Sequence, residues 1–218
     1  PYRGRQSTTA YGTKITVQFS PTTKNTPWRK SVNGLIASEL DKANSEVLMT
    51  LFVFSEQKLA NVLQKKYSSS HQFTIGLLIE PKFAYRNYSE MLDMWGIQLK
   101  DENCGYERGN KPWSLPLYDI GVPAMARGDM LHHKYAVIDE STVVVGSQNW
   151  SDSANHTNDE NVLVIKNARI AKMYKQEFKR LESGSRKGPT KSLMKRISQM
   201  DNACSGAFHD QKQSIPLK

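Results

Sequence analysis

The chain has 218 residues, and its 30 lysines and arginines outnumber 21 acidic residues, so its formal net charge is +9. This length fits one domain with polar ends. The positive charge favours a polyanionic partner, either nucleic acid or an anionic membrane surface. With two cysteines, no zinc-ligand spacing and no apolar run near 18 residues, the sequence excludes a disulfide framework, a recognisable zinc motif and a membrane-spanning helix within these residues.

Two features of the chain leave questions open. Cys104 and Cys204 are free to pair, but their spacing gives no reason to expect it. The chain starts at Pro1 instead of methionine, so a leader, an anchor or another domain can have been removed. We therefore leave the compartment undetermined, with an exported or membrane-anchored form among the possibilities.

Apolar periodicity divides the first hundred residues into alternating elements. Residues 1–10 read as an irregular polar extension. Ser55 is a candidate N-cap for the second helix. We expect strands over 13–19, 47–54, 73–79 and 97–99, and helices over 32–43, 59–63 and 88–95.

The second half continues this order with strands over 134–139, 142–145 and 162–165 and a helix over 168–181. Alternating strands and helices favour crossover connections, so we predict an α/β fold with a mixed, mostly parallel sheet and helices on both faces. The expected domain limits are a polar N-terminal extension over 1–10, a catalytic domain over 11–183 and a basic C-terminal tail over 184–218. A short amphipathic helix near 193–200 fits within that tail, which otherwise adds phosphate contacts or is a flexible end.

Residues 101–130 have no clear period and are rich in glycine and proline. A loop of this length in a compact domain is usually functional or disordered. Because it leads directly into the next strand, it can form a wall of a site, where Trp113 and Arg127 would stack on bases or bind phosphates. The alternative is a surface loop with Trp113 tucked into the core.

The stretch from 131 to 161 carries most of the chemistry. Side chains alternate along a strand, so His132 and Lys134 project from one face and His133 from the other, where packing or a surface role is expected. A hairpin then brings Ser147 and Asn149 back toward His132.

These residue types suit phosphate chemistry. Lysine, hydroxyl and amide groups bind phosphoryl oxygens, and an imidazole attacks phosphorus or protonates a leaving oxygen. The carboxylate of Glu160 can hold the far ring nitrogen of His132.

The whole pattern resembles the HKD signature of the phospholipase D superfamily over roughly residues 12–182. The matching residues are His132, Lys134, Asp139, Gly146, Ser147, Asn149 and Glu160. The resemblance implies an α/β sandwich and a metal-independent phosphodiesterase with no cofactor. In that family a site of this kind has two histidines, and a chain with one signature is similar to the small bacterial nucleases, which complete it as a homodimer.

Carried over to this sequence, the resemblance assigns three groups of residues. The expected catalytic residues are His132, Lys134, Asn149 and Glu160. The expected substrate-binding residues are Ser147, Lys134, Asn149, Trp113 and Arg127. Asp139 and Gly146 are expected to be structural at the site, and no metal ligand is expected.

The function predicted is a nuclease that hydrolyses DNA, with single-stranded DNA or RNA also open as substrates, through a covalent phosphohistidine shared across a homodimer. Small size, the single signature and the basic charge favour a nucleic acid substrate. The alternatives are a phospholipase D-type hydrolase of anionic phospholipids and the nuclease module of a larger restriction or toxin protein. A non-enzymatic nucleic-acid-binding protein is disfavoured, because a site that had lost its catalytic activity would have no physical need to keep His132, Lys134, Asn149 and Glu160 together.

Overall fold

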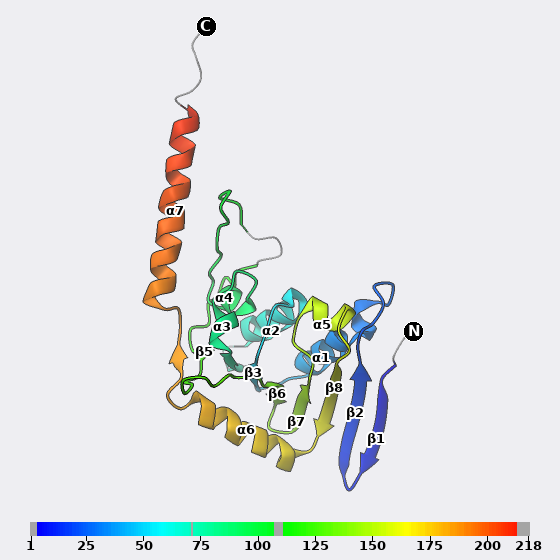
Figure 1. Ribbon diagram of the computed structural model, residues 1–218. Helices are drawn as coiled ribbons and strands as arrows, with labels where there is room; N and C mark the ends of the chain where they lie inside the picture. Colours follow the sequence, from blue (N-terminus) through cyan, green and yellow to red (C-terminus); the bar gives the residue numbers. More distant parts are fainter. Residues whose placement is uncertain (1–3, 71, 107–110, 213–218) are drawn as a thin grey trace.

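The computed structural model describes residues 4–70, 72–106 and 111–212. In these residues one mixed sheet has the strand order β1-β2-β8-β7-β6-β3-β4-β5-β9 (Figure 1). Its strands are β1 Gln6–Ala10, β2 Thr13–Phe19, β3 Glu46–Leu51, β4 Thr74–Ile79, β5 Gly121–Val122, β6 Lys134–Ile138, β7 Thr142–Gly146, β8 Asn161–Lys166 and β9 Arg186–Lys187. The helices are η1 Trp28–Lys30, α1 Val32–Asp41, α2 Gln57–Ser69, α3 Pro81–Ala84, α4 Glu90–Met94, α5 Asp152–His156, α6 Ala168–Glu182 and α7 Lys191–Lys212.

The mixed sheet with helices on both faces confirms the predicted fold class, but the expectation of mostly parallel strands is wrong. Within the described sheet only the β3–β4 and β4–β5 pairs are parallel, and the other neighbours are antiparallel. The β3–α2–β4 unit is a crossover of the expected kind. The remaining strands pair as hairpins or over long range, which a local strand–helix pattern does not reveal.

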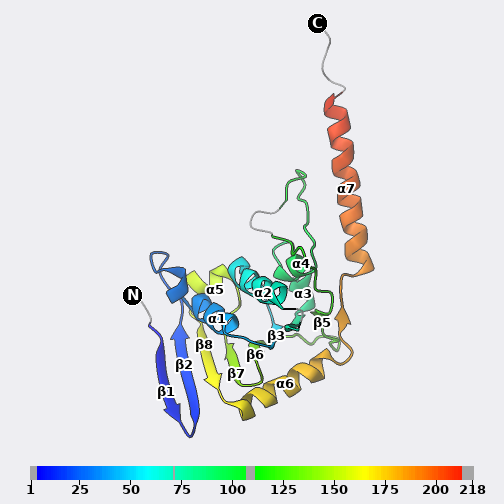
Figure 2. The ribbon, with the colours of Figure 1, turned by 180° about the vertical axis from the view of Figure 1, so that it is seen from behind.

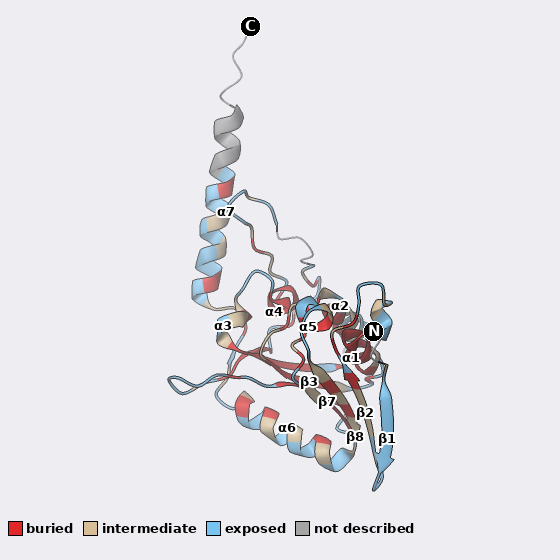
Figure 3. Cartoon of the chain, turned by 45° about the vertical axis from the view of Figure 1, so that its right-hand side comes forward, coloured by how far each residue is buried: buried red, intermediate tan, exposed pale blue. Residues whose placement is uncertain are grey.

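Two apolar cores lie on opposite faces of the sheet. Helices α1, α2 and α4 cover one face, and α6 alone covers the other (Figures 1 and 2). Alternation along β3 divides the cores, because Val47 and Met49 face the larger core and Leu48 faces the core under α6. Helix α6 presents Ile170, Tyr174, Phe178 and Leu181 to the sheet at helical spacing, as Figure 3 shows by its buried stripe.

The N-terminal region differs from the irregular lead that we expected. Residues 6–10 form β1, an edge strand that pairs with β2 through a turn at Tyr11 and Gly12, both with positive φ. Every residue of β1 is exposed and most are polar. Such a strand leaves no apolar alternation for sequence reading to detect.

Three local expectations were also wrong. The N-cap of α2 is Glu56, whose carboxylate accepts from the Lys58 N–H, and not Ser55. Residues 97–99 are not a strand; the only pairing there is an isolated bridge from Lys100 to Tyr106. We also expected only a short tail helix near 193–200, whereas α7 spans Lys191–Lys212.

Helix α7 projects from the body and is attached to it by several contacts (Figure 1). Leu193 is buried in the larger core, and Cys204 forms a disulfide with Cys104 across 100 residues of sequence. The ion pair between Lys100 and Asp201, at 2.7 Å, reinforces this attachment. The pairing that the sequence left open is therefore made, because the fold brings both cysteines together.

Among the described residues, no helix is both long and apolar enough to cross a membrane.

Candidate active site

Most of the predicted site residues gather at one end of the central strands, where β3 and β7 end and β6 and β8 begin. The order β8-β7-β6-β3 is antiparallel throughout, so ends and beginnings of neighbouring strands meet there. His132 lies two residues before Lys134, the first residue of β6, and Ser147 directly follows β7. Asn161 opens β8, immediately after Glu160. A tight hairpin and its return strand thus bring together His132 and Glu160, which are 28 positions apart in sequence.

The side chains of His132 and Lys134 contact each other at this end of the strands. The Lys134 Nζ lies 3.3 Å from Nε2 of His132 and donates to the His132 carbonyl oxygen at 3.0 Å. The imidazole is exposed, whereas Lys134 is 8% exposed. The alternation expected for the strand is confirmed, because His133 points instead to α6 and pairs with Glu177 at 3.2 Å.

An aromatic side chain packs against both members of this pair. The Phe52 ring lies 4.5 Å from the His132 ring and 4.7 Å from Nζ of Lys134. Phe52 follows β3, and its N–H donates to the His133 carbonyl oxygen at 2.8 Å. This ring restricts the imidazole and attracts the ammonium group through its negative face.

The charge state of Lys134 depends on burial and on Glu160. Burial lowers the pKa of the Lys134 ammonium, and the negative charge of Glu160 acts in the opposite direction. No hydrogen bond joins Glu160 to His132 among the described residues, so the expected clamp on the imidazole is absent within one chain. Glu160 instead favours the charged form of the lysine.

The loop after β7 presents hydrogen-bonding groups. The Ser147 hydroxyl oxygen accepts from the Asn161 N–H at 3.0 Å and from Asn161 Nδ2 at 3.2 Å, which leaves its own proton to donate outward. The side chain of Asn149 is partly exposed, and its Oδ1 is buried without a hydrogen-bond partner in the described part of the chain. A buried acceptor of this kind marks a place where a partner group is missing.

Gly146 allows the loop to pass close to β8. A Cβ at this position would stand 2.0 Å from the carbonyl oxygen of Asn161. The Ser147 N–H then bonds that same carbonyl at 3.1 Å. The close backbone approach therefore leaves no room for a side chain at Gly146, in line with the structural role predicted for it.

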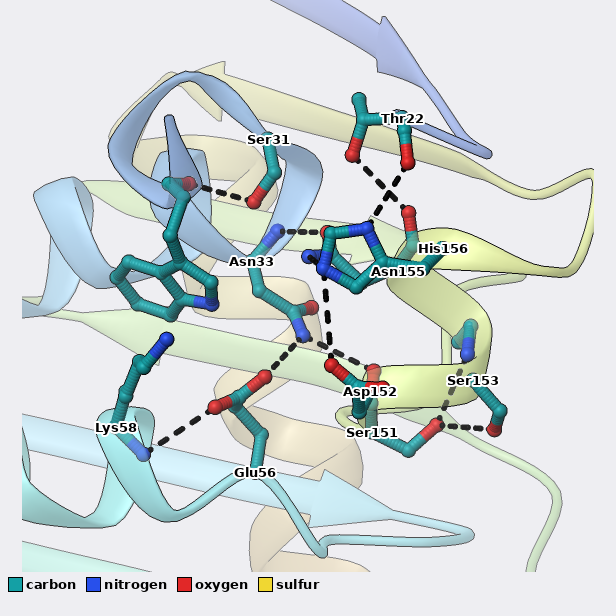
Figure 4. A network of polar contacts seen from close by, with 12 residues as sticks. Thr22, Ser31, Asn33, Glu56, Lys58, Ser151, Asp152, Ser153, Asn155 and His156 are labelled. Carbon is teal, nitrogen blue, oxygen red and sulfur yellow. Dashed lines mark hydrogen bonds and ion pairs between the residues drawn. The ribbon is translucent and has the colours of Figure 1, made fainter. Parts of the chain in front are cut away.

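A buried polar network supports this loop from behind (Figure 4). Nδ2 of Asn33 donates to Glu56 at 2.9 Å and to the Ser151 carbonyl oxygen at 3.0 Å, and the Asn33 oxygen accepts from Gln148 at 2.9 Å. The backbone N–H of Asn33 donates to Asn155 Oδ1 at 3.0 Å. Asn33, Gln148 and Asn155 are at most 1% exposed, so this network fixes α1, the loop and α5 to one another.

Sequence reading missed this network and also missed Glu80. Glu80 follows β4 and is 3% exposed, and its Oε2 accepts from the Leu131 N–H at 2.8 Å. It thereby holds the backbone immediately before His132. A polar residue just past a predicted buried strand was the available signal, since side chains at strand ends commonly build sites in open α/β sheets.

Two of the expected site residues lie elsewhere. Trp113 is 2% exposed and lies 5.8 Å from Tyr67, ring to ring, so the expected stacking role is wrong and the core placement holds. Asp139 stands at the opposite end of β6, with φ +47°, and accepts from the backbone N–H groups of Asn44, Ser45 and Glu46 at 2.8–3.0 Å. Its structural role is confirmed, but it acts on a turn and not at the site.

Arg127 is exposed in the loop that leads to His132, with no ion pair among the described residues. Its part in substrate binding remains a prediction. On the α6 side, a pocket of about 360 Å³ reaches from His132, Lys134 and Gly146 to Met173 and Tyr174. The described residues contain no cluster of three or more His, Cys, Asp or Glu side chains that could hold a metal ion.

The family model for "Cardiolipin synthase, PLD-like domain" matches residues 36–182, which is more than half of the chain and contains the whole site. The chain belongs to the phospholipase D superfamily of phosphodiesterases.

Curated relatives and solved structures agree with this membership. The chain is 35% identical to human mitochondrial cardiolipin hydrolase over 158 residues, 71% of this chain and 52% of that protein. It is 49% identical to the Xenopus tropicalis protein of the same name over 68 residues, 30% of this chain and 32% of that protein. The chain thus spans about half the length, or less, of these relatives.

The fold is similar to two bacterial proteins of known structure. Nuc from Salmonella typhimurium, a phospholipase D family member, has a TM-score of 0.61 at 18% identity, over 82% of this chain and 99% of that chain. NucT from Helicobacter pylori has a TM-score of 0.54 at 17% identity, over 79% of this chain and 99% of that chain. Both matches confirm the sheet-and-helix architecture and the expected resemblance to Nuc.

Proposed function

We propose that this protein is a metal-independent nuclease that hydrolyses DNA, with single-stranded DNA and RNA as further candidate substrates. The observation that carries the proposal is the exposed His132 imidazole, which contacts Lys134 and Phe52 where the central strands end. Ser147 and Asn149 follow the neighbouring strand and offer donors for phosphoryl oxygens. The structural likeness to Nuc and NucT supports the nuclease fold, and the net charge of +9 suits a polyanion.

In this proposal, a ring nitrogen of His132 attacks the phosphorus atom while the bond to the leaving oxygen breaks. The imidazolium of the partner subunit's His132 gives its proton to that oxygen. The resulting neutral imidazole then takes a proton from water, whose oxygen attacks phosphorus and breaks the phosphorus–nitrogen bond. The ammonium of Lys134 offsets the negative charge that builds on the phosphoryl oxygens.

A homodimer supplies the second histidine in this mechanism. The chain contains a single His-x-Lys signature, and a two-fold interface lets one residue appear on both sides of a site. Two features of the single chain support a site that a second copy completes. The His132 imidazole is exposed, and Oδ1 of Asn149 has no hydrogen-bond partner among the described residues. A second copy or the substrate would supply the missing groups.

The test is cleavage of supercoiled plasmid and of a single-stranded oligonucleotide in excess EDTA. We expect cutting by the wild type and none by His132→Ala, whereas His133→Ala is the matched control because its ring faces α6. Cutting that persists in His132→Ala would contradict the proposal.

Shared catalysis has its own test in a differentially tagged heterodimer of wild type and His132→Ala. A composite site predicts almost no activity, since one of its two histidines is missing. Half of the wild-type activity would show that each chain works alone.

A second candidate function is hydrolysis of an anionic phospholipid. It is favoured by the name that the curated relatives share, mitochondrial cardiolipin hydrolase, and by the partly apolar pocket between the site and α6. Cardiolipin vesicles incubated under the same conditions distinguish the candidates. Release of phosphatidate without any cutting of DNA or RNA would replace the nuclease proposal.

A further inference from the structure

Three arginines lie close to Tyr85, and we call them the arginine cluster: Arg86, Arg186 and Arg196. Nη2 of Arg186 donates to the Tyr85 hydroxyl at 3.0 Å, and its guanidinium carbon lies 5.9 Å from the ring centroid. Nη2 of Arg196, from α7, donates to the Tyr85 carbonyl oxygen at 3.3 Å. Arg86 follows Tyr85 in sequence, and its side chain donates to the Lys82 carbonyl oxygen at 3.1 Å. Tyr85 thus binds two of the three arginines and adjoins the third.

Two hollows of the surface meet at this cluster. One, of about 340 Å³, is lined by Tyr85, Arg186 and Arg196. The other, of about 270 Å³, is lined by Tyr85, Arg86, Arg196 and Lys100. All three arginines are exposed, so their remaining N–H groups are available to a ligand.

The cluster lacks negative partners. Within the described ranges, none of its three arginines forms an ion pair with a carboxylate, and Lys100 beside them is paired only with Asp201. Three cations of α6 differ: Lys175, Lys179 and Arg180 each contact a glutamate at 2.6–2.7 Å. Like charges that gather without a counter-charge repel one another, which an anionic ligand would relieve. The guanidinium fork matches the geometry of phosphate oxygens.

Helix α3 connects the cluster to the candidate active site. Glu80 at its start holds the backbone before His132, and the Phe83 ring lies 4.7 Å from Phe52, which packs against His132. Tyr85 follows at the end of the same helix. The cluster and His132 are thus linked through one four-residue helix and two packed aromatic rings. A strand bound at both places would connect them by a short run of linked phosphates.

We propose that the arginine cluster binds the phosphodiester backbone of a polynucleotide a few nucleotides away from the phosphate at His132. This inference rests on the proposed nuclease function and narrows its substrate to a chain of linked phosphates. A small phosphodiester that occupies the site at His132 would not reach the cluster.

The test compares a long and a small substrate in one triple variant, Arg86→Gln, Arg186→Gln and Arg196→Gln. The substrate is a single-stranded oligonucleotide of about 30 nucleotides. The logarithm of its binding constant falls linearly with the logarithm of the salt concentration, and each lost phosphate contact makes this slope shallower by about 0.7, so three lost contacts make it shallower by about 2. At 0.1 M salt this corresponds to about fivefold per contact, and to about 100-fold in kcat/KM for the triple variant. Hydrolysis of bis(p-nitrophenyl) phosphate should stay within about twofold.

The matched control removes three exposed cations at the opposite edge of the sheet: Lys14→Gln, Arg169→Gln and Lys172→Gln. The net charge changes equally, so a general field effect would lower oligonucleotide cleavage in both triple variants. Equal losses in both, or no loss in the cluster variant, would overturn the inference while leaving the nuclease proposal standing. If the wild type cuts no polynucleotide, the nuclease proposal itself fails.

Two further measurements keep the test decisive. Arg86→Gln and Arg196→Gln are also made singly, because these side chains bond only backbone carbonyls in the recorded contacts and their loss should not unfold the protein. Each single variant should lose about fivefold on the oligonucleotide. If the triple variant instead loses binding to cardiolipin vesicles and keeps its oligonucleotide cleavage, the cluster serves a membrane surface and the inference is wrong.

Discussion

The ammonium nitrogen of Lys134 lies 3.3 Å from Nε2 of His132. A charged lysine has donors and no acceptor, so this contact suits a ring nitrogen that offers a lone pair. The candidate nucleophile is thus contacted by a residue two positions further along the chain. Because burial lowers the pKa of Lys134 and Glu160 opposes that effect, the pair also depends on a carboxylate that lies just before β8.

Glu160→Gln should shift the alkaline side of the pH–rate profile to lower pH. The carboxylate favours protonated Lys134, so its removal lowers the pKa of the lysine further, and the charged form is lost earlier as the pH rises. The measurement is kcat/KM for bis(p-nitrophenyl) phosphate against pH. Glu140→Gln, which removes the same charge beyond the far end of β6, should leave the profile in place. An alkaline limb at the wild-type position in Glu160→Gln would refute this coupling.

Gly146→Ala should damage both folding and catalysis. Its new Cβ would stand 2.0 Å from the Asn161 carbonyl oxygen, so β7 or β8 must shift and the Ser147 contacts with Asn161 must change. Forced overpacking typically costs about 1–3 kcal/mol. Thermal unfolding and oligonucleotide cleavage check this expectation. Gly105→Ala is the control, since its nearest neighbour would lie at an ordinary 3.5 Å; equal behaviour of both variants would contradict the argument.

Asp139→Asn should reduce stability at neutral pH with little effect on the chemistry. Burial raises the pKa of Asp139, but hydrogen bonds from Glu46, Ser45 and Asn44 outweigh it and hold the pKa below the ordinary 3.8. A depressed carboxyl pKa contributes stability that is present above the unfolded value and is lost as the pH falls through the folded value. The variant should therefore lose on the order of 1–2 kcal/mol at pH 7 and approach the wild type in acid.

Urea unfolding of Asp139→Asn and wild type at pH 7 and pH 3 tests this sign. A difference that grows toward pH 3 would mean that the carboxyl group is not the one that titrates. Catalysis should persist where the variant is folded, because Asp139 and His132 lie beyond opposite ends of β6, whose five residues rise about 3.3 Å each.

Loss of the disulfide should loosen α7 and leave the catalytic edge intact. The bond closes a span of 100 residues, for which loop-closure entropy gives an upper estimate of about 4–5 kcal/mol. We expect Cys104→Ser with Cys204→Ser to unfold at lower urea concentration, and limited proteolysis to cut α7 first. Hydrolysis of a small phosphodiester should be unchanged. Its loss would place α7 closer to the chemistry than its contacts indicate.

Much of the site could be predicted from sequence because its signals are local. His132 and Lys134 share a face through the two-residue period of a strand, and the alternation also sends His133 to the opposite face, where it meets Glu177. The small residues at the end of β7 predict a close backbone approach, and the geometry at Gly146 agrees with this prediction. Each of these features depends on a few neighbouring residues.

Other features depend on residues far apart in the sequence. The burial of Trp113, the pairing of Cys104 with Cys204 and the hydrogen bond from Leu131 to Glu80 each join segments with no shared local pattern. The network around Asn33 likewise joins α1 to the segment from Ser151 to Asn155, more than 100 residues away in sequence.

The sequence by itself determined the superfamily, the strand that carries His132 and Lys134, and the helix α6 with its apolar stripe, because period and motif spacing are properties of short segments. Only the tertiary structure decided that the sheet is largely antiparallel, that Glu160 acts on Lys134, and that Arg86, Arg186 and Arg196 meet at Tyr85. These contacts form when burial of two apolar cores brings distant strands and α7 together. The free energy that selects them belongs to the whole folded chain and to no single segment of it.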